Sequence, residues 1–254
     1  MAEKDRKAPM RHFISVYLEH DTPRHGGAAR RAVRGFFFMD RFSPPAGRRD
    51  CFHMDAPRRY NAEMEAILAA LDPADKPRLL LHSCCGPCSS AVLQRLTPHF
   101  AVTVYYDNPN ILPAEEYAHR LAEQRRLIAA LGAPVDLREG PYDPETFLEA
   151  VRGLEDEPEG GRRCERCFAL RLGRTARLCA AEGYDWFTTT LTVSPHKNAE
   201  QVNRACEAAA AETGARALPA DFKKRDGYKQ SLALSRQFGL YRQDYCGCPF
   251  SRRG

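Results

Sequence analysis

Short apolar runs alternate with longer segments of helical periodicity from residue 60 onward. Four runs of β-branched, aromatic and aliphatic residues predict strands, at 79–82, 102–106, 135–137 and 185–190. Each run is followed by a stretch that is long enough for a helix and carries helix start or stop signals. This order predicts an α/β fold in which helices flank a parallel sheet, with right-handed crossovers between the strands.

The helix boundaries follow from capping residues and from glycine. We predict helices at 60–71, from Ser89, from Pro113 to Gly132, from Asp143-Pro144, at 165–182 and from Asn198 to about Thr213. Asn198 with Gln201 three residues later resembles a capping box. In such a sheet the ligand site lies outside the carboxyl ends of the strands, so we expect functional residues in the loops that follow them.

Residues 1–58 differ from the rest of the chain. They contain Gly26-Gly27, Pro44-Pro45 and scattered arginines, with little sustained periodicity. A basic arm or a transit-like segment would have this composition, but we expect a disordered extension or a misassigned start, with Met54 as the true start. Residues 59–254 are then the catalytic domain.

The composition is that of a globular protein. Apolar residues make up 43% of the 254 residues and charged residues 28%. The apolar clusters at 36–39 and 79–81 are far shorter than the about 20 residues that span a bilayer. We therefore expect no membrane association and a cytoplasmic location. The net charge of +5, from 31 arginines and seven lysines among the basic residues, suggests a nucleic-acid partner. Genome-driven arginine enrichment explains the same number equally well.

Seven of the ten cysteines fall into three clusters: Cys84-Cys85-x-x-Cys88, Cys164-x-x-Cys167 and Cys246-x-Cys248. A cytoplasmic chain of this length does not need disulfide staples, so the clusters indicate metal or redox chemistry. The first cluster follows the first strand and begins a helix, where backbone N–H groups and the helix dipole stabilise thiolates. The isolated Cys51, Cys179 and Cys206 are expected to be core or incidental residues.

The spacing of the other two clusters also has chemical meaning. Two sulfurs three residues apart on a helix, as in Cys164 and Cys167, can bind one ion or cluster. The one-residue gap between Cys246 and Cys248 suits a strained redox disulfide or a second metal grip. Structural zinc would use four thiolates, but the adjacent Cys84 and Cys85 fit that site poorly, so a 4Fe-4S cluster is favoured.

Other predicted loops reach the same edge of the sheet. Asp107 and Asn108 follow the second strand, and Asp107 could ligate a harder metal, donate a proton or form a local turn. The loop 188–198 holds hydroxyls, His196 and Lys197, and His196 is a candidate acid. Residues 221–229 combine basic and aromatic side chains that suit phosphate contact and base stacking, although a solvated charged face would look the same. Aromatic residues near the last cysteine pair predict an ordered tail that folds back over this edge.

Together these segments resemble the QueH family of epoxyqueuosine reductases from about Tyr60 to the end of the chain. The resemblance rests on the motifs LLLHSCCGPCSS, VYYDNPNILPAEEY, CERCFALRL, FTTTLTVSPHKN, DFKKRDGYKQS and LYRQDYCGC, in this order. It implies a HUP-like, Rossmann-like sheet with an iron-sulfur site at the carboxyl ends of the strands. It also implies the last step of queuosine synthesis, which is the cobalamin-independent reduction of epoxyqueuosine to queuosine at the tRNA wobble position.

The resemblance further implies roles for individual residues. Cys84, Cys85, Cys164 and Cys167 become the ligands of a 4Fe-4S cluster, and Cys246 with Cys248 becomes a redox-active pair. Cys88 and Asp107 are assigned to an adjacent mononuclear iron or to the surroundings of the cluster. Asp107 or His196 would supply protons. The implied partners are the anticodon stem-loop of tRNA and an electron donor such as a ferredoxin or flavodoxin.

Two other functions fit part of the pattern. A HUP-like tRNA sulfurtransferase would use persulfide cysteines and ATP, but it should have a glycine-rich phosphate loop where this chain has Cys84-Cys85. A zinc-stabilised RNA-binding module would contain zinc without acid-labile sulfide.

Overall fold

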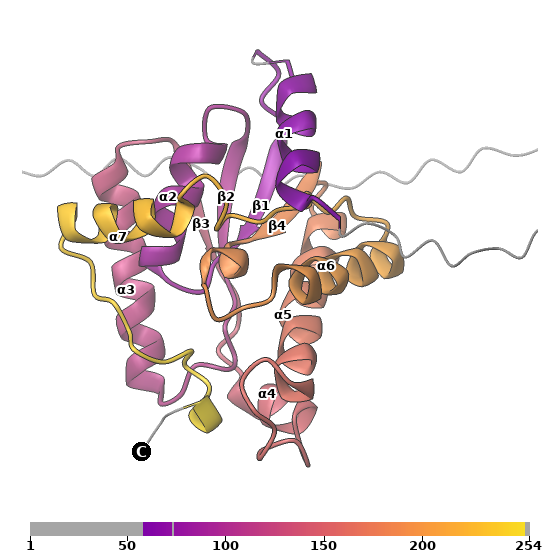
Figure 1. Cartoon of the computed structure of the whole chain (residues 1–254), viewed down its shortest axis with the longest axis vertical. Helices are drawn as coiled ribbons and strands as arrows, with labels where there is room; N and C mark the ends of the chain where they lie inside the picture. Colours follow the sequence, from indigo (N-terminus) through magenta and orange to yellow (C-terminus); the bar gives the residue numbers. More distant parts are fainter. Residues whose placement is uncertain (1–57, 73, 252–254) are drawn as a thin grey trace, which may run out of the picture. The chain divides into compact units, whose positions relative to one another are not determined.

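Four parallel strands form the centre of the fold, in the order β3-β2-β1-β4 (Figure 1). Their bounds are Arg78–His82 for β1, Ala101–Tyr106 for β2, Val135–Glu139 for β3 and Trp186–Thr189 for β4. The computed structural model describes residues 58–72 and 74–251, which belong to one compact unit, Met54–Gly254. The prediction of an α/β fold with a parallel sheet is confirmed.

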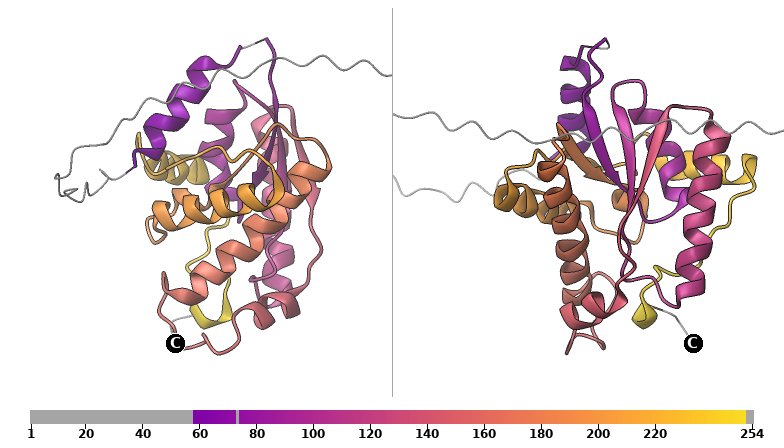
Figure 2. Two further views of the ribbon diagram at one scale, coloured as in Figure 1. Left: turned by 90° about the vertical axis from the view of Figure 1, so that its right-hand side faces the viewer. Right: turned by 180° about the vertical axis from the view of Figure 1, so that it is seen from behind.

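Helices cover both faces of the sheet (Figures 1 and 2). The described helices are α1 (Tyr60–Ala70), α2 (Gly86–Leu96), α3 (Ala114–Leu131), α4 (Pro144–Ala150), α5 (Arg162–Ala181), α6 (Ala199–Thr213) and α7 (Gly227–Gln237), with short 3₁₀ turns at Thr190–Val193 and Pro249–Ser251. None of them is long and apolar enough to cross a membrane.

Side chains along each strand point alternately to the two faces of the sheet, so the core has two layers. Leu79 and Leu81 point to the face covered by α1, α2, α3 and α7, where they pack with Val92 and Phe222. Leu80 points to the opposite face and packs with Leu172 of α5, next to α6. The isolated cysteines Cys179 and Cys206 are buried in this second layer, so their predicted core role is confirmed. Cys51 and residues 1–57 lie outside the described residues.

The order of the strands places a crevice at β1. After β1 the chain builds β2 and β3 on one side, whereas β4 pairs with β1 on the other side. Such a reversal separates the loops that leave β1 and β4 and opens a ligand site between them. The loops concerned are Ser83–Cys85 after β1 and Thr190–Lys197 after β4.

Most predicted helix ends are confirmed by their caps. The Asp143 carboxylate accepts a hydrogen bond from the Thr146 N–H at 3.2 Å, and the Asn198 side chain accepts from the N–H groups of Glu200 and Gln201. The reciprocal bond of a capping box, from the Asn198 N–H to the Gln201 side chain, is absent among the described residues, and the Gln201 amide donates to the Gly160 carbonyl at 3.2 Å.

Several boundaries differ from the prediction, and one helix was missed. Helix α2 begins at Gly86 rather than at Ser89, because Pro87 occupies its first turn. Helix α5 begins at Arg162, and β4 ends at Thr189 because the next residues form a 3₁₀ turn. Helix α7, which we did not predict, packs against α2 and buries Leu234.

The C-terminal tail, residues 238–251, leaves α7 and runs along α3 to the edge of the sheet (Figures 1 and 2). Its polar contacts with α3 begin at Arg126, which donates to the Phe238 and Gly239 carbonyls, and end at Arg120, which donates to the Cys246 carbonyl. The prediction of an ordered tail that folds back over the edge is confirmed.

Candidate active site

Three sulfur atoms meet where β1 passes into α2. The Sγ atoms of Cys84, Cys85 and Cys88 all lie within 4.8 Å of one another. Hydrogen bonds from Cys85 and then from Cys88 hold the pKa of Cys84 well below its ordinary value. The same hydrogen bond, made to the Cys84 sulfur, raises the pKa of Cys85 to about 12. Of the three sulfurs, that of Cys84 is therefore the one whose thiolate form is most favoured.

A buried polar network holds the loop that carries these cysteines. The Ser83 and Ser89 hydroxyls donate to Oε1 of Gln124 at 2.7 and 2.9 Å and lie 2.6 Å from each other. The Asn108 amide donates to the Ser83 carbonyl at 2.9 Å. These contacts fix the loop to α3 and to the end of β2, so the positions of the three sulfurs depend on both elements.

The loop after β4 closes the other side of the crevice. The Thr190 hydroxyl accepts a hydrogen bond from the Cys84 N–H at 3.3 Å and lies 3.6 Å from the Cys84 sulfur. Below it, Nδ1 of His82 lies 2.8 Å from the Thr189 hydroxyl, and burial lowers the pKa of His82 to about 3. His82 is therefore neutral, and it ties β1 to β4 directly beneath the cysteines.

The remaining cysteines form a second group next to the first. Cys164 and Cys167 of α5 line one narrow gap together with Cys246 and Cys248 of the tail. Cys167 and Cys248 pack against Phe147, and burial raises their pKa values to about 11 and about 12. Cys164 stands at the edge of this group, where its sulfur accepts the Gly160 N–H at 3.2 Å.

Two cations stand at the border between the cysteine groups. Arg171, which is 1% exposed, donates to the Cys167 sulfur at 3.8 Å and to Oδ1 of Asn108. The Lys197 ammonium lies 3.8 Å from the Cys246 sulfur. Burial disfavours the charge of Lys197, but nearby Cys246 and Cys84 outweigh burial and raise its pKa. These cations offset the charge that several thiolates would bring to the site.

Sequence reasoning did not assign either cation to the site. A signal for Arg171 was present, because it follows Cys167 by four residues and therefore lies on the same face of α5. Lys197 lies in a loop with many polar residues, and only the folded structure shows that it, among them, contacts the Cys246 sulfur.

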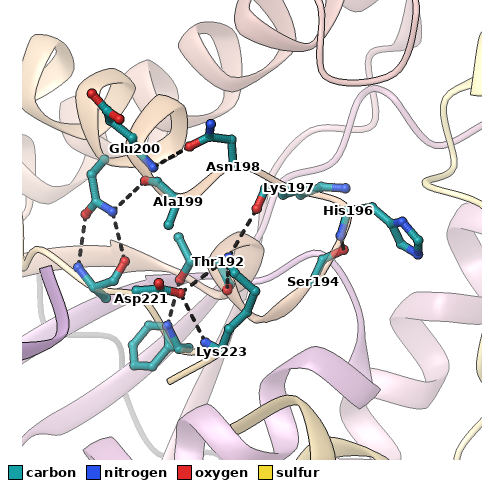
Figure 3. A network of polar contacts seen from close by, with 12 residues as sticks. Thr192, Ser194, His196, Lys197, Asn198, Ala199, Glu200, Asp221 and Lys223 are labelled. Carbon is teal, nitrogen blue, oxygen red and sulfur yellow. Dashed lines mark hydrogen bonds and ion pairs between the residues drawn. The ribbon is translucent and has the colours of Figure 1, made fainter. Parts of the chain in front are cut away.

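Figure 3 shows how this loop is held. The Lys223 ammonium donates to the carbonyls of Thr192 and Lys197, both at 3.1 Å, and it is also ion-paired with Asp221. The side chains of His196 and Lys197 point away from this network. One lysine of the basic segment 221–229 thus supports the loop, and phosphate contact by the other basic residues of the segment stays a prediction.

Asp107 and Asn108 lie in different surroundings, although we predicted that both would face the cysteines. Asn108 reaches the Cys84 loop, whereas the buried Asp107 carboxylate contacts Arg174 at 3.3 Å and lines neither the cysteine cavity nor the narrow gap. Burial raises the pKa of Asp107, and its second oxygen lacks a hydrogen-bond partner among the described residues. Its role as a metal ligand or proton donor stays a prediction.

A cavity of about 950 Å³ opens onto the first cysteine group. Its lining includes Cys84, Cys88, Arg171, Lys197, Cys246, His196, Tyr228 and the tail residues Tyr241, Arg242, Gln243, Asp244 and Tyr245. The volume suits a nucleoside-sized ligand, and the aromatic and cationic walls suit a base with its phosphate. Of the predicted site residues, Cys84, Cys88, Cys246 and His196 face this cavity, and Cys164, Cys167 and Cys248 line the narrow gap beside it.

Known proteins are similar in sequence to this chain over most of its length. The family model for "Epoxyqueuosine reductase QueH" matches residues 79–254. The protein of that name from Streptococcus pyogenes is 40% identical over 182 residues, which cover 70% of this chain and 71% of the relative. Those from Staphylococcus epidermidis and Dehalococcoides mccartyi are each 39% identical, over 76% and 69% of this chain and 84% and 92% of the relatives.

Among solved structures, the U34-tRNA thiolase NcsA from Methanococcus maripaludis with its [4Fe-4S] cluster matches with a TM-score of 0.45 and 13% identity. The match covers 76% of this chain and 67% of that protein. The sequence matches alone identify the family, because they are strong and extend over the strands, the cysteine loops and the tail that build the site. The chain belongs to the QueH family of epoxyqueuosine reductases.

Proposed function

We propose that this chain reduces epoxyqueuosine to queuosine at the wobble position of tRNA, as the last step of queuosine biosynthesis. The observation that carries the proposal is the convergence of cysteines from three distant segments on one cavity and the gap beside it, in a chain of the QueH family. The cavity is large enough for the modified nucleoside, and redox-capable sulfurs lie on its wall.

The reaction removes one oxygen atom and needs two electrons and two protons. The epoxide oxygen leaves as water, and an alkene remains. Oxidation of the Cys246 and Cys248 thiols to a disulfide releases two electrons and two protons, so one such pair balances one turnover. A ferredoxin or flavodoxin would then return the pair to the dithiol form.

The residues present suit an iron-sulfur centre. Three sulfurs within 4.8 Å form a soft donor set, and Arg171 and Lys197 face the cysteines as counter-charges. We assign Cys84, Cys85, Cys164 and Cys167 as the ligands of a 4Fe-4S cluster, in support of which Cys84 and Cys164 pack against the same core layer. Cys88 is then left to hold an adjacent iron. When bound, such a centre supplies single-electron transfer and Lewis acidity.

The protein's own groups position the substrate and supply protons. Tyr228, Tyr241 and Tyr245 line the cavity and offer aromatic faces for a base turned out of the anticodon loop. Arg242 at the cavity wall suits a flanking phosphate. His196 lines the cavity at an exposed position, where it can exchange protons with solvent and donate to the leaving oxygen.

The test combines metal analysis with turnover. The full chain is purified anaerobically, assayed for iron, acid-labile sulfide and zinc, and incubated with epoxyqueuosine-containing tRNA and a reductant. We expect iron and sulfide together with conversion to queuosine, measured by mass spectrometry of nucleosides. A folded, colourless protein that contains only zinc and leaves the epoxide intact would refute the proposal in favour of a zinc-stabilised module.

A further inference from the structure

One face of helix α3 is occupied by the C-terminal tail. The side chains that contact the tail are spaced by three, one, three and three residues and therefore lie on one side of the helix: Glu116, His119, Arg120, Glu123 and Arg126. Arg126, Glu123 and Arg120 contact the tail backbone at 238–239, 241 and 245–246 in turn, so that the tail runs antiparallel to α3 and brings the Cys246–Cys248 loop beside Arg120. Glu116 and His119 both contact the side chain of Tyr241.

Arg120 is buried at the end of this face. Only 1% of the residue is exposed, and its Nε donates to Glu116 at 2.7 Å. Its Nη1 and Nη2 atoms donate to the carbonyls of Cys246 and Tyr245, at 3.1 and 3.3 Å. The planar guanidinium of Arg120 thus connects the Glu116 carboxylate, through Nε, with the backbone of the cysteine loop, through Nη1 and Nη2.

The cysteine loop has little freedom at this place. Gly247 has φ +101°, a left-handed conformation that favours glycine. A Cβ there would lie 2.8 Å from Cγ1 of Ile111 and 3.0 Å from Nη1 of Arg120. On the other side the Leu112 N–H donates to the Gly247 carbonyl at 3.0 Å, so that the loop lies between Arg120 and the 111–112 backbone.

We infer that Arg120 is a positioning residue that holds the backbone of Cys246-Gly247-Cys248 so that both thiols stay at the cysteine site. Residues 238–248 contain no helix or strand, and side chains of α3 supply many of their backbone partners. Hydrogen bonds to a charged donor stabilise more than neutral ones, so loss of the guanidinium should release the loop. The importance of Arg120 for activity rests on the proposed redox role of the two thiols, whereas its positioning of the loop does not depend on that role.

The test measures how fast each cysteine is alkylated in the anaerobic full-length holoenzyme, by mass spectrometry of peptides. Cys248 is 6% exposed and should react slowly in the wild type. In Arg120→Met its rate should rise about tenfold or more, because two charge-assisted hydrogen bonds are lost. Arg120→Lys should give an intermediate rate, since one ammonium cannot replace the fork. Gly247→Ala should also raise the rate, because the added methyl group displaces the loop.

Arg125→Met is the matched control, since Arg125 lies on the same helix but pairs with Glu139 away from the tail. Cys206, which is buried in the opposite core layer, reports on the fold within each sample. If Arg120→Met also exposes Cys206, the comparison of Arg120→Lys with Arg125→Lys decides instead. A wild-type Cys248 rate in the folded Arg120 variant would overturn the inference.

A second measurement separates positioning from general loosening. Arg120 contacts the backbone of the loop while Cys246 and Cys248 are free thiols, so we expect its hydrogen bonds to favour the dithiol form. In a glutathione buffer, Arg120→Met should shift the pair toward the disulfide, Arg120→Lys should restore part of the wild-type ratio, and Arg125→Met should leave the ratio unchanged. An unchanged ratio in Arg120→Met would contradict the inference. Both measurements stay decisive even if the protein fails to reduce epoxyqueuosine.

Discussion

Individual side chains divide the cysteine site into groups with different surroundings. Hydrogen bonds from its cysteine neighbours lower the pKa of Cys84, which lies next to Arg171 and Thr190, whereas burial raises the pKa values of Cys167 and Cys248. Cys246 faces both the large cavity and the narrow gap. The proposed cluster ligands thus come from both groups, and the proposed redox pair lies in the second group.

Serine substitutions should separate these two roles. Cys84→Ser, Cys85→Ser, Cys164→Ser and Cys167→Ser should lose the cluster, because the hydroxyl is a poor ligand for iron. Cys246→Ser and Cys248→Ser should abolish turnover but keep iron and sulfide. Iron and sulfide content, with the visible spectrum, measures the difference. Normal cluster content in all four ligand variants would contradict the assignment.

Gln124 should support the cysteine loop energetically. Its Oε1 accepts from two buried serine hydroxyls, and replacement by leucine leaves both without that acceptor. We expect Gln124→Leu to lower the free energy of unfolding by about 1–3 kcal/mol. The exposed Gln94→Leu on α2 should change it by less than about 0.5 kcal/mol. Urea denaturation of both variants checks this, and equal stabilities would refute the role of Gln124.

Among the elements, helix α3 packs against the core on one face and binds the C-terminal tail on another. Tyr117, Leu121 and Leu127 of α3 are buried in the core, while the adjacent face holds the tail. Capping signals predicted the helix from Pro113 and its end at Gly132, and Gly132 takes the left-handed conformation that is typical of a glycine at a helix end. These signals could not reveal that charged residues on the second face bind backbone, because exposed and tail-bound charges give the same pattern.

The contact between α3 and the tail should weaken in acid. Glu123 accepts hydrogen bonds from Arg126 and from the Tyr241 N–H, and the bond from Arg126 is the main cause that lowers its pKa from 4.5. Because the folded-state pKa is depressed, this stabilisation is complete above about pH 4.5 and is lost as the pH falls further. Hydrogen exchange at Tyr241, corrected for its intrinsic pH dependence, should therefore show loss of protection.

Glu123→Gln is the matched variant for this pH dependence. It keeps an acceptor oxygen for Tyr241 but cannot be protonated in this range. Its Tyr241 protection should be nearly independent of pH, apart from a contribution of His119, which also faces Glu123. A wild-type pH dependence in Glu123→Gln would assign the effect to another group.

At the scale of the whole molecule, the basic residues are not all available to RNA. Lys223 supports the loop after β4, and Lys229 is paired with Asp226. Lys224 and Arg225 line a second cavity of about 250 Å³ between α2 and α7 and both are exposed, although Arg225 is also ion-paired with Glu65 at 2.9 Å. Helix α7 also lines the active-site cavity through Tyr228, so RNA entering that cavity passes close to these two residues.

The salt dependence of the affinity for tRNA should therefore be determined in part by Lys224 and Arg225. Replacing Lys224 and Arg225 by glutamine should reduce the slope of log Kd against log salt by about 0.7 to 0.9 for each lost phosphate contact. Arg204→Gln on α6, which pairs with Glu200, should leave the slope unchanged. Filter binding at several salt concentrations measures the slope. Equal slopes in the double variant and the wild type would exclude this surface from RNA binding.

The sequence by itself determined the sheet, most helices and the three cysteine clusters, because hydrophobic period, caps and close Cys spacing are local properties of the chain. It also determined the family, through the order of its motifs. Only the tertiary structure decided which sulfurs meet, that Asn108 rather than Asp107 reaches the first group, and that Arg120, Arg171 and Lys197 belong to the site. These outcomes depend on contacts between segments up to 126 residues apart, as between Arg120 and Cys246, and such contacts leave no periodic signal in the sequence.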